Sequence, residues 1–378
     1  MVTYPNDWKE DKVSNVVDIS TGCRDTQDNK ANGRYPFFVR SPIVERIDIA
    51  DYDCEAVLTA GDGVGTGKVF HYYNGKFAAH QRVYVMNNFR DVDGKYFYYF
   101  FSKNFIKEVE KYTAKSSVDS VRRAMIADME FTHPQLPEQQ DIVRVLTAFD
   151  SYIADLAELI EKKRCIRDGA LEDLMSRRTR LDGFFEEWEE AKLSDICNVF
   201  DGTHQTPKYT LQGVRFVSVE DIKDIYQSNK YISQSAYDSD FKVYPEKGDI
   251  LMTRIGDIGT PCVVERDEPL AYYVSLALFK NIAVNSKFLY YYIMSVAFKR
   301  ELDDRTLHHA TPKKINKGEI GKCKVQYPRD VAEQVAIADV LSAMDEEIKS
   351  LEIEREKMIQ IREGAMDDLL TGRVRLRV

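Results

Sequence analysis

Residues 138–181 read EQQDIVRVLTAFDSYIADLAELIEKKRCIRDGALEDLMSRRTRL, and residues 333–376 read EQVAIADVLSAMDEEIKSLEIEREKMIQIREGAMDDLLTGRVRL. The two stretches align without a gap at a constant offset of 195 residues. An internal repeat of this length fixes the architecture of a chain before local patterns are considered. The identical pairs include Glu138/Glu333, Gln139/Gln334, Ile142/Ile337, Leu146/Leu341, Asp150/Asp345, Ile153/Ile348, Leu156/Leu351, Arg167/Arg362, Gly169/Gly364 and Leu174/Leu369.

The segments that precede these stretches also repeat, although more weakly. The matched positions are Trp8/Trp188, Lys12/Lys192, Ser14/Ser194 and Gly22/Gly202, followed by Thr59 and Val64-Gly65-Thr66 against Thr253 and Ile258-Gly259-Thr260. The residues between these positions differ. The chain is therefore predicted as a first globular domain (1–136), a constant helix (137–181), a second globular domain (182–330) and a second constant helix (331–378).

Apolar residues in both constant stretches recur at alternating spacings of three and four, which is typical of a coiled-coil seam. A helix of nearly forty residues is roughly 55 Å long, and it needs a partner to cover such a stripe. The nearest partner is the other copy, so we expect an antiparallel helix pair with pseudo-two-fold symmetry. The pair is either a scaffold alone or a spacer that also docks another protein. The predicted seam consists of Ile142, Leu146, Phe149, Ile153, Leu156, Ile160, Ile337, Leu341, Met344, Ile348, Leu351 and Met358.

The surfaces and ends of these helices carry further signals. The second helix has an acidic outer face that includes Glu347, Glu352 and Glu354, which is usually a solvated face. Gly372 suits the end of that helix, whereas the first copy ends in Ser176-Arg177-Arg178, so the first helix can end differently.

The globular segments mix strand and helix patterns. Strands are predicted at Val83–Met86, at 214–219 and at 249–253, the last followed by a Gly-rich turn at Gly256–Gly259. Aromatic stretches at Tyr96–Phe100 and Phe288–Met294 lie in matching places and predict buried helices. We therefore expect an α+β fold, with two similar α/β domains separated by the helix pair.

The composition narrows the class of protein. The 378 residues are 44% hydrophobic and have a net charge of −9, and no run of apolar residues is long enough for a membrane span. No signal peptide precedes the first domain, and the six cysteines are scattered, so we expect a cytoplasmic protein with reduced thiols. The acidic excess is greatest, for its length, in residues 331–378, whereas the globular segments are near neutral and leave room for a basic face.

The sequence contains no complete motif for catalysis or metal binding. Gly61–Lys68 resembles a phosphate-binding loop, but Asp62 and Val69 stand where that motif needs Gly and Ser or Thr, so a tight turn is the better interpretation. His308 and His309 are adjacent and point apart on any regular element, which makes them poor joint metal ligands. We expect no catalytic residue, no metal site and no cofactor on this chain.

Polar and basic loops remain, and they fit DNA. Lys and Arg neutralise phosphates, and Arg, Gln, His and Asn can read base edges; each cluster could equally be an ordinary solvated loop. The candidate DNA-binding residues are Gln81, Arg82, Lys115, Arg122, Arg123, Thr203, His204, Gln205, Lys208, His308, His309, Lys313, Lys314 and Lys317.

The chain resembles the specificity subunits of type I restriction-modification systems. The resemblance rests on Leu136-Pro137-Glu138-Gln139-Gln140, on Ala332-Glu333-Gln334, on Leu369–Arg373 and on Gly256-Asp257-Ile258-Gly259, and it covers the whole chain. It implies a subunit without catalytic activity, in which two target recognition domains each read one half of a split DNA sequence. It also implies that the helices hold two methyltransferase subunits, which bind S-adenosylmethionine and methylate adenine at N6, and that restriction subunits with translocase activity join the complex.

Two other functions stay open. A scaffold or silent relative would bind methyltransferase without reading DNA, which the net charge of −9 favours. A free-standing enzyme lacks any supporting motif. The target sequence and the spacer length do not follow from the residues, because no code maps such loops to bases.

Overall fold

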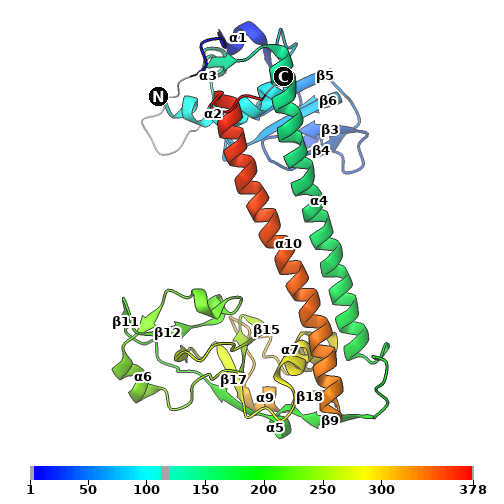
Figure 1. The fold of residues 1–378 in the computed structure, drawn as a ribbon, viewed down its shortest axis with the longest axis vertical. Helices are drawn as coiled ribbons and strands as arrows, with labels where there is room; N and C mark the ends of the chain where they lie inside the picture. The colour runs from blue at the N-terminus through cyan, green and yellow to red at the C-terminus, as the bar shows by residue number, and fades with distance from the viewer. Residues whose placement is uncertain (1–3, 112–119, 377–378) are drawn as a thin grey trace. The chain divides into compact units, whose positions relative to one another are not determined.

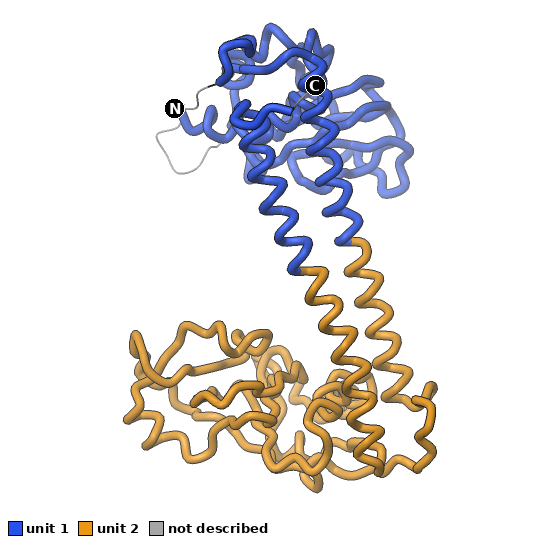
Figure 2. The backbone as a smooth tube through the Cα atoms, in the orientation of Figure 1, with its two compact units in different colours: residues 1–157, 353–378 blue, residues 158–352 orange. Residues whose placement is uncertain are grey.

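The computed structural model describes residues 4–111 and 120–376. It contains two compact units, which Figure 2 distinguishes by colour: unit 1 comprises residues 1–157 and 353–378, and unit 2 comprises residues 158–352. The boundary falls inside both long helices, α4 (Leu136–Met175) and α10 (Val331–Thr371). Each unit therefore holds one globular domain, the start of the helix that follows this domain, and the end of the helix from the other copy.

The globular domain of unit 1 is built on a six-stranded sheet of order β2-β7-β5-β6-β3-β4, with a separate two-stranded sheet of β1 and β8 (Figure 1). The helix α2 packs its aromatic residues against the sheet, because Phe97, Phe101 and Phe105 are fully buried beside Val57 and Met86. The elements are β1 (Lys9–Lys12), α1 (Val13–Val16), β2 (Asp18–Thr21), η1 (Thr26–Asp28), β3 (Tyr35–Phe38), β4 (Glu45–Ile47), β5 (Tyr52–Ala60), β6 (Phe70–Ala79), β7 (Val83–Asn87), α2 (Gly94–Lys111), α3 (Arg123–Ala127) and β8 (Glu130–His133).

The globular domain of unit 2 has a four-stranded sheet of order β10-β17-β14-β15, a second sheet of order β11-β13-β12-β16, and the pair β18-β9. Its elements are β9 (Trp188–Lys192), α5 (Leu193–Ile196), β10 (Asn198–Asp201), β11 (Tyr209–Thr210), β12 (Val214–Val217), η2 (Val219–Asp221), η3 (Ile225–Gln227), β13 (Tyr231–Ile232), α6 (Gln234–Asp240), β14 (Ile250–Ile255), β15 (Asp257–Val263), β16 (Leu270–Tyr272), β17 (Leu276–Lys280), α7 (Ser286–Met294), α8 (Val296–Asp303), α9 (Lys317–Gly321) and β18 (Lys324–Pro328).

The two domains share a framework. The strand order β2-β7-β5-β6 in unit 1 corresponds to β10-β17-β14-β15 in unit 2, and the pair β1-β8 corresponds to β9-β18. They differ beyond this framework, since unit 1 extends the same sheet with β3 and β4 whereas unit 2 builds a second sheet. The predicted α+β class is confirmed, as are the strands at Val83, Val214 and Ile250 and the buried helices α2 and α7.

One predicted turn is shorter than expected. Only Gly256 stands between β14 and β15, with a φ of 81°, whereas Asp257 and Gly259 already belong to β15. The positive φ explains the glycine, since L residues with a Cβ avoid that region. The predicted turn at Gly61–Lys68 does connect two strands, β5 and β6.

The long helices end at matching repeat positions. Gly372 has a φ of 69° after α10, and Arg177, its repeat counterpart, has a φ of 62° after α4. The first copy thus makes the same left-handed helix end without a glycine. The guanidinium of Arg177 lies over the ring of Trp188, 6.0 Å from its centroid.

The helices run antiparallel within each unit. In unit 1, Asp150 pairs with Arg362 and the Tyr152 hydroxyl donates to Glu354, so that rising numbers on α4 meet falling numbers on α10. In unit 2, Lys163 pairs with Glu347 at 2.7 Å and Arg164 pairs with Glu352. On the acidic face of α10, Glu347 and Glu352 are exposed, as expected of a solvated face, but they and Glu354 also contact α4.

The predicted seam residues are all buried or half-buried, but not all of them pack between two helices alone. Ile142 and Leu146 join the unit 1 core together with Phe131 and with Leu369 from α10. Ile337 and Leu341 likewise join the unit 2 core, which contains residues of α7 and the end of α4. The start of each helix is thus part of a domain core, which ties the helix rigidly to its own domain.

Candidate functional site

Three polar segments of the unit 2 domain meet at Arg254, which is 5% exposed near the end of β14. Its guanidinium forms an ion pair with Asp201, and its Nε donates to the carbonyl of Ile315 at 3.0 Å. Asp201 directly precedes the loop 202–208, and Ile315 directly follows Lys313 and Lys314. A buried arginine therefore holds both candidate DNA-binding loops against the β14–β15 hairpin.

The backbone fixes the second of these loops to the hairpin tip. Gly256 N donates to the carbonyl of Lys313 and Leu307 N donates to the carbonyl of Lys314, both at 2.8 Å. A cleft of about 200 Å³ lies here, lined by Asp257, Lys299, His308 and Lys313 among others. The side chains of His309, Lys313, Lys314 and Lys317 are exposed.

His308 is less available than its neighbours. Its Nε2 lies 3.0 Å from the carbonyl oxygen and 3.4 Å from the carboxylate of Asp303. Among the described residues, no group of His, Cys, Asp and Glu is arranged to hold a metal ion.

The loop at Gly202–Lys208 begins with a tight backbone approach. A Cβ on Gly202 would stand 2.5 Å from the carbonyl oxygen of Tyr272, so only glycine fits. Thr203 and Gln205 then form a local turn, in which each contributes one hydrogen bond of 3.3 Å to the other. The turn leaves His204, Gln205 and Lys208 exposed to solvent.

The unit 1 domain brings its own loops together in the same region of the framework. Gly61 N donates to the carbonyl of Arg82 and Val121 N donates to the carbonyl of Gly61, both at 2.7 Å. Gln81 N donates to the carbonyl of Arg24 at 2.9 Å. Glycine is required at position 22 for the same steric reason as at position 202, because a Cβ on Gly22 would stand 2.0 Å from the carbonyl oxygen of Ala79.

The predicted side chains of this domain differ in availability. Gln81 donates to Asp25 at 3.0 Å, and Arg82 lies 3.7 Å from Asp62 while two-thirds of it stays exposed. Arg123 is directed to the carbonyl of Ile19 at 3.4 Å. Arg122 is exposed, and Lys115 lies outside the described residues.

Sequence reasoning missed two arginines. Arg40 forms an ion pair of 2.8 Å with Asp62 and so joins Arg82 beside the glycine-rich loop, but its position is not marked by the repeat. Arg254 had a usable signal, since a charged residue inside the mostly apolar run 250–255 indicates a buried polar role.

A buried glutamine fixes the start of each long helix. Gln139 accepts from the backbone N of Asp93 and donates to the carbonyl of Pro134, both at 2.9 Å. Gln334 does the same with Asn285 N and the carbonyl of Pro328, both at 2.7 Å. Both glutamines are at most 2% exposed, so they connect the helix to the beginning of α2 or α7 through satisfied, water-free hydrogen bonds.

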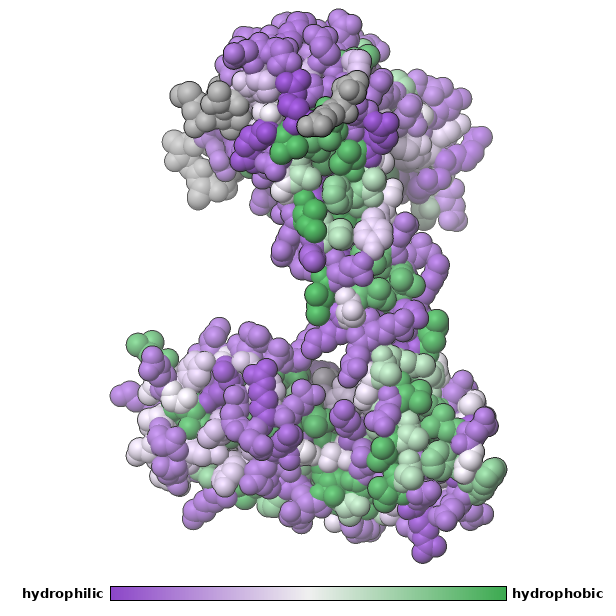
Figure 3. Space-filling model, in the orientation of Figure 1, coloured by the Kyte–Doolittle hydropathy of each residue, from purple (hydrophilic) through white to green (hydrophobic). Residues whose placement is uncertain are grey.

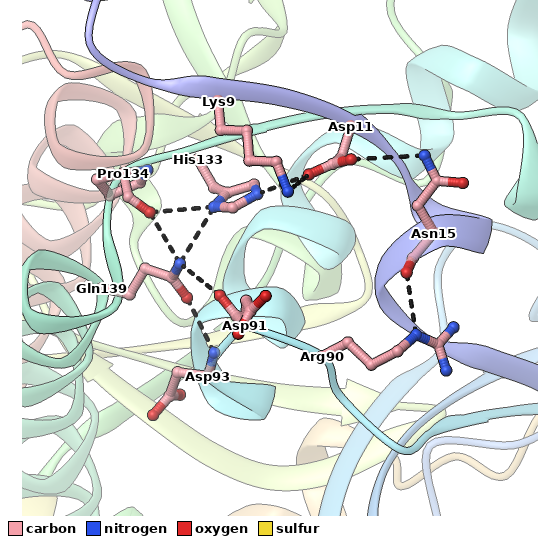
Figure 4. A network of polar contacts seen from close by, with 9 residues as sticks. All are labelled: Lys9, Asp11, Asn15, Arg90, Asp91, Asp93, His133, Pro134 and Gln139. Carbon is pink, nitrogen blue, oxygen red and sulfur yellow. Dashed lines mark hydrogen bonds and ion pairs between the residues drawn. The ribbon is translucent and has the colours of Figure 1, made fainter.

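The unit 1 copy of this contact carries a histidine (Figure 4). His133 is buried, with its Nδ1 3.2 Å from the Gln139 amide nitrogen and its Nε2 3.4 Å from Asp11. Asp11 in turn pairs with Lys9 at 2.8 Å. Pro328 stands at the repeat position of His133, so this extension of the network is confined to the first copy.

Each unit also contains a glutamate–arginine pair whose two partners come from different copies of the repeat. Glu138, at the start of α4, accepts two hydrogen bonds from Arg375, which follows α10. Glu333, at the start of α10, accepts two from Arg180, which follows α4, at 2.9 and 2.8 Å. The hydrogen bonds to these glutamates raise the pKa of both arginines, so both guanidiniums stay charged.

A second contact between the two copies, formed by an aspartate, lies further along each helix. Asp150 binds the Tyr99 hydroxyl at 2.6 Å and Arg362 at 3.0 Å, and Asp345 binds Tyr291 at 2.8 Å and Arg167 at 3.5 Å. Burial, together with the aspartate, raises the pKa of both tyrosines, which therefore remain hydrogen-bond donors. In each of these contacts, the aspartate belongs to the helix that begins in the unit, and the arginine belongs to the helix of the other copy.

Comparison with known proteins agrees with this doubled arrangement. The family described as the type I restriction modification DNA specificity domain matches residues 5–163 and 185–361. The specificity subunit of the type I restriction enzyme MjaVIII from Methanocaldococcus jannaschii is 22% identical over 406 residues, which cover 99% of this chain and 94% of that protein. The EcoDI specificity subunit from Escherichia coli is 32% identical over 142 residues, covering 38% and 31%.

A solved structure shares the fold. The crystal structure of the S subunit of a type I restriction-modification system from M. genitalium superposes with a TM-score of 0.64 at 19% identity, and the match covers 96% of each chain.

Proposed function

The chain belongs to the type I restriction modification DNA specificity family and is a DNA sequence-specificity subunit, and from this premise we propose that each globular domain reads one half of a bipartite DNA target. The observation that carries the proposal is the convergence of loops at the same place in both frameworks. Loops of unit 2 meet at Arg254, and loops of unit 1 meet around Gly61. Each set presents exposed basic and amide side chains from a backbone held by buried contacts.

The charges suit this task despite the net charge of −9. Phosphate contacts need local Lys and Arg rather than a basic protein as a whole. In unit 2, Lys208, Lys313, Lys314 and Lys317 are exposed on the converging loops. Asp257 and Asp303 lie beside these loops, and the acidic residues Glu347 and Glu352 of α10 pair with Lys163 and Arg164.

The helices are the proposed docking surface for partner subunits. In Figure 3, hydrophilic side chains cover most of both globular domains, and hydrophobic side chains gather over the long helices. In unit 2, Leu159, Ile166, Val335 and Val340 are exposed; in unit 1, Tyr152, Ile353 and Ile361 are exposed. Several exposed apolar side chains on the same pair of helices favour contact with another protein.

The proposed partners are two methyltransferase subunits, which would bind S-adenosylmethionine and methylate adenine at N6, and restriction subunits. The chain itself would supply no catalytic group and no cofactor. None of the described helices is long and apolar enough to cross a membrane. We place the complex in the cytoplasm, where its DNA substrate lies.

A test should first assemble the chain with its methyltransferase and select from a random duplex library. We expect a bipartite motif with a fixed, unspecified spacer, and methylation mapping across the host genome should return the same motif. A complex that assembles but selects no motif would favour the alternative function, a scaffold that reads no DNA.

A variant series then tests the loops. Replacing Lys313 and Lys314 together by Ala should weaken binding and lower the slope of log K against log salt by about two, because each phosphate contact contributes about 0.9. The matched control replaces Lys322 and Lys324, which are in the same domain but pair with Glu319 and Glu190 at 2.7 Å. Equal salt slopes for both double variants would contradict the placement of the DNA at the converging loops.

A further inference from the structure

An apolar side chain stands at the tip of the glycine-rich loop of unit 1. Val64 is 98% exposed, more than any other large hydrophobic residue among those described. A single exposed valine is ordinary on a protein surface, so the exposure of Val64 is informative only together with its place at the loop tip. Its position, rather than its exposure alone, calls for an explanation.

The loop is built to project this residue. Gly63 on one side has a φ of 76°, and a Cβ on Gly65 on the other side would stand 2.4 Å from the carbonyl oxygen of Arg40. Both positions therefore require glycine. The loop closes on itself, because Thr66 N donates to the carbonyl of Gly63 at 3.1 Å and Val69 N donates to that of Gly65 at 3.0 Å.

Basic side chains surround the tip. The Arg40 guanidinium lies about 4.0 Å from the point where a Cβ on Gly63 would stand, and Arg82 approaches Asp62 in the same loop. The adjacent Val121 backbone brings Arg122 to this region. Arg40 and Arg82 share Asp62 as their partner and stay 46% and 66% exposed, so both guanidiniums can also bind phosphates beside the tip. Asp25, the other nearby acid, accepts a hydrogen bond from Gln81.

We propose that Val64 reads the 5-methyl group of a thymine in the half-site bound by the unit 1 domain. The methyl group is the apolar feature that the major groove displays, and small apolar side chains contact it. Flanking arginines on phosphates would hold the tip in the groove. The proposal rests on the proposed function and names a residue that determines specificity.

The second domain has no exposed apolar side chain at the repeat position of Val64, although Leu211, between β11 and β12, is 97% exposed. Ile258 is the repeat counterpart of Val64, and it lies in β15, packed against the unit 2 core. The two copies therefore present different chemistry at the same framework position. The unit 2 domain presents polar and basic groups from the loop 308–314 instead.

The experiment uses the chain assembled with its methyltransferase and the duplex that the library selects. Each thymine of the target is replaced in turn by 2′-deoxyuridine, which removes only the methyl group. We expect one thymine whose replacement weakens wild-type binding about fourfold, the factor that corresponds to about 0.8 kcal/mol for one buried methyl-sized group. The Val64→Ala variant should lose most of this fourfold difference, because its single methyl group covers less of the thymine methyl.

The matched control is Ile49→Ala. Ile49 is 54% exposed in the same domain but lies between β4 and β5, outside the glycine-rich loop. This variant should keep the wild-type response to deoxyuridine.

The outcomes separate the two proposals. A wild type that selects no motif contradicts the proposed function. A wild type that selects a motif but tolerates deoxyuridine at every position overturns the role of Val64 alone, as does a Val64→Ala variant that remains as sensitive as wild type.

Discussion

The two globular domains differ least where they meet the long helices and most at their loop tips. At the helix starts, Gln139 and Gln334 make the same two hydrogen bonds, and Glu138 and Glu333 bind equivalent arginines. At the tips, Val64 is exposed in one copy while its counterpart Ile258 packs into the core in the other. A duplicated chain can thus keep its assembly contacts fixed while its reading loops diverge.

The difference has a physical origin. A buried polar contact fails when either partner changes, because the remaining group loses its hydrogen bond away from water. An exposed loop tip loses nothing in the folded protein when its side chain changes. Three pairs of equivalent residues test whether the framework is as symmetric in energy as in contacts.

The largest effect is expected at the helix seam. Leu156→Asp buries a charge at a position that is 5% exposed, and it should destabilise the protein by about 4 kcal/mol. Its counterpart Leu351 is half-buried, so Leu351→Asp should cost about half as much. Chemical unfolding measures both, and Leu159→Asp, at an exposed position of α4, is the control with an effect below about 0.5 kcal/mol. Full stability of Leu156→Asp would contradict the helix pairing.

The glutamate–arginine pairs should be unequal. The Glu333 side chain is 0% exposed and also accepts from Trp188 Nε1, so Glu333→Ala should destabilise by about 3 kcal/mol. Glu138→Ala should cost about 2 kcal/mol, because Arg375 is 40% exposed and water can hydrate the charge that is left. Thermal unfolding of both variants checks the order. A larger loss for Glu138→Ala would show that exposure does not set the difference.

The glycines are expected to give effects of both signs, the smallest of them at Gly169. Gly22→Ala and Gly202→Ala place a Cβ 2.0 and 2.5 Å from a carbonyl oxygen, so each should destabilise its domain by about 1–3 kcal/mol, Gly22→Ala more. Each should also weaken DNA binding through its own half-site. The helical Gly169 has no atom within 4 Å of its Cβ position, so Gly169→Ala should raise stability by up to about 1 kcal/mol. The same sign for all three variants would refute the steric argument.

The contacts between the loops were not predictable from the sequence. The repeat and the polar composition placed candidates on the right segments, including Lys313, Lys314 and Gly202. They did not reveal that Arg254 joins those segments, or that Arg40 joins Arg82 at Asp62. Partners so far apart in the chain become visible only when the sheet brings them together.

The sequence by itself determined the duplication, the α+β class and the length of both helices, because identical residues at one offset and a regular apolar spacing are properties of the chain. The antiparallel pairing of the two copies also followed from the sequence, but only the tertiary structure decided which side chains fix the end of each helix, as Arg180 at Glu333 and Arg375 at Glu138 demonstrate. The physical reason is that a hydrophobic stripe specifies that a helix needs a partner, whereas the polar contacts at its ends depend on which charges the folded chain brings within reach.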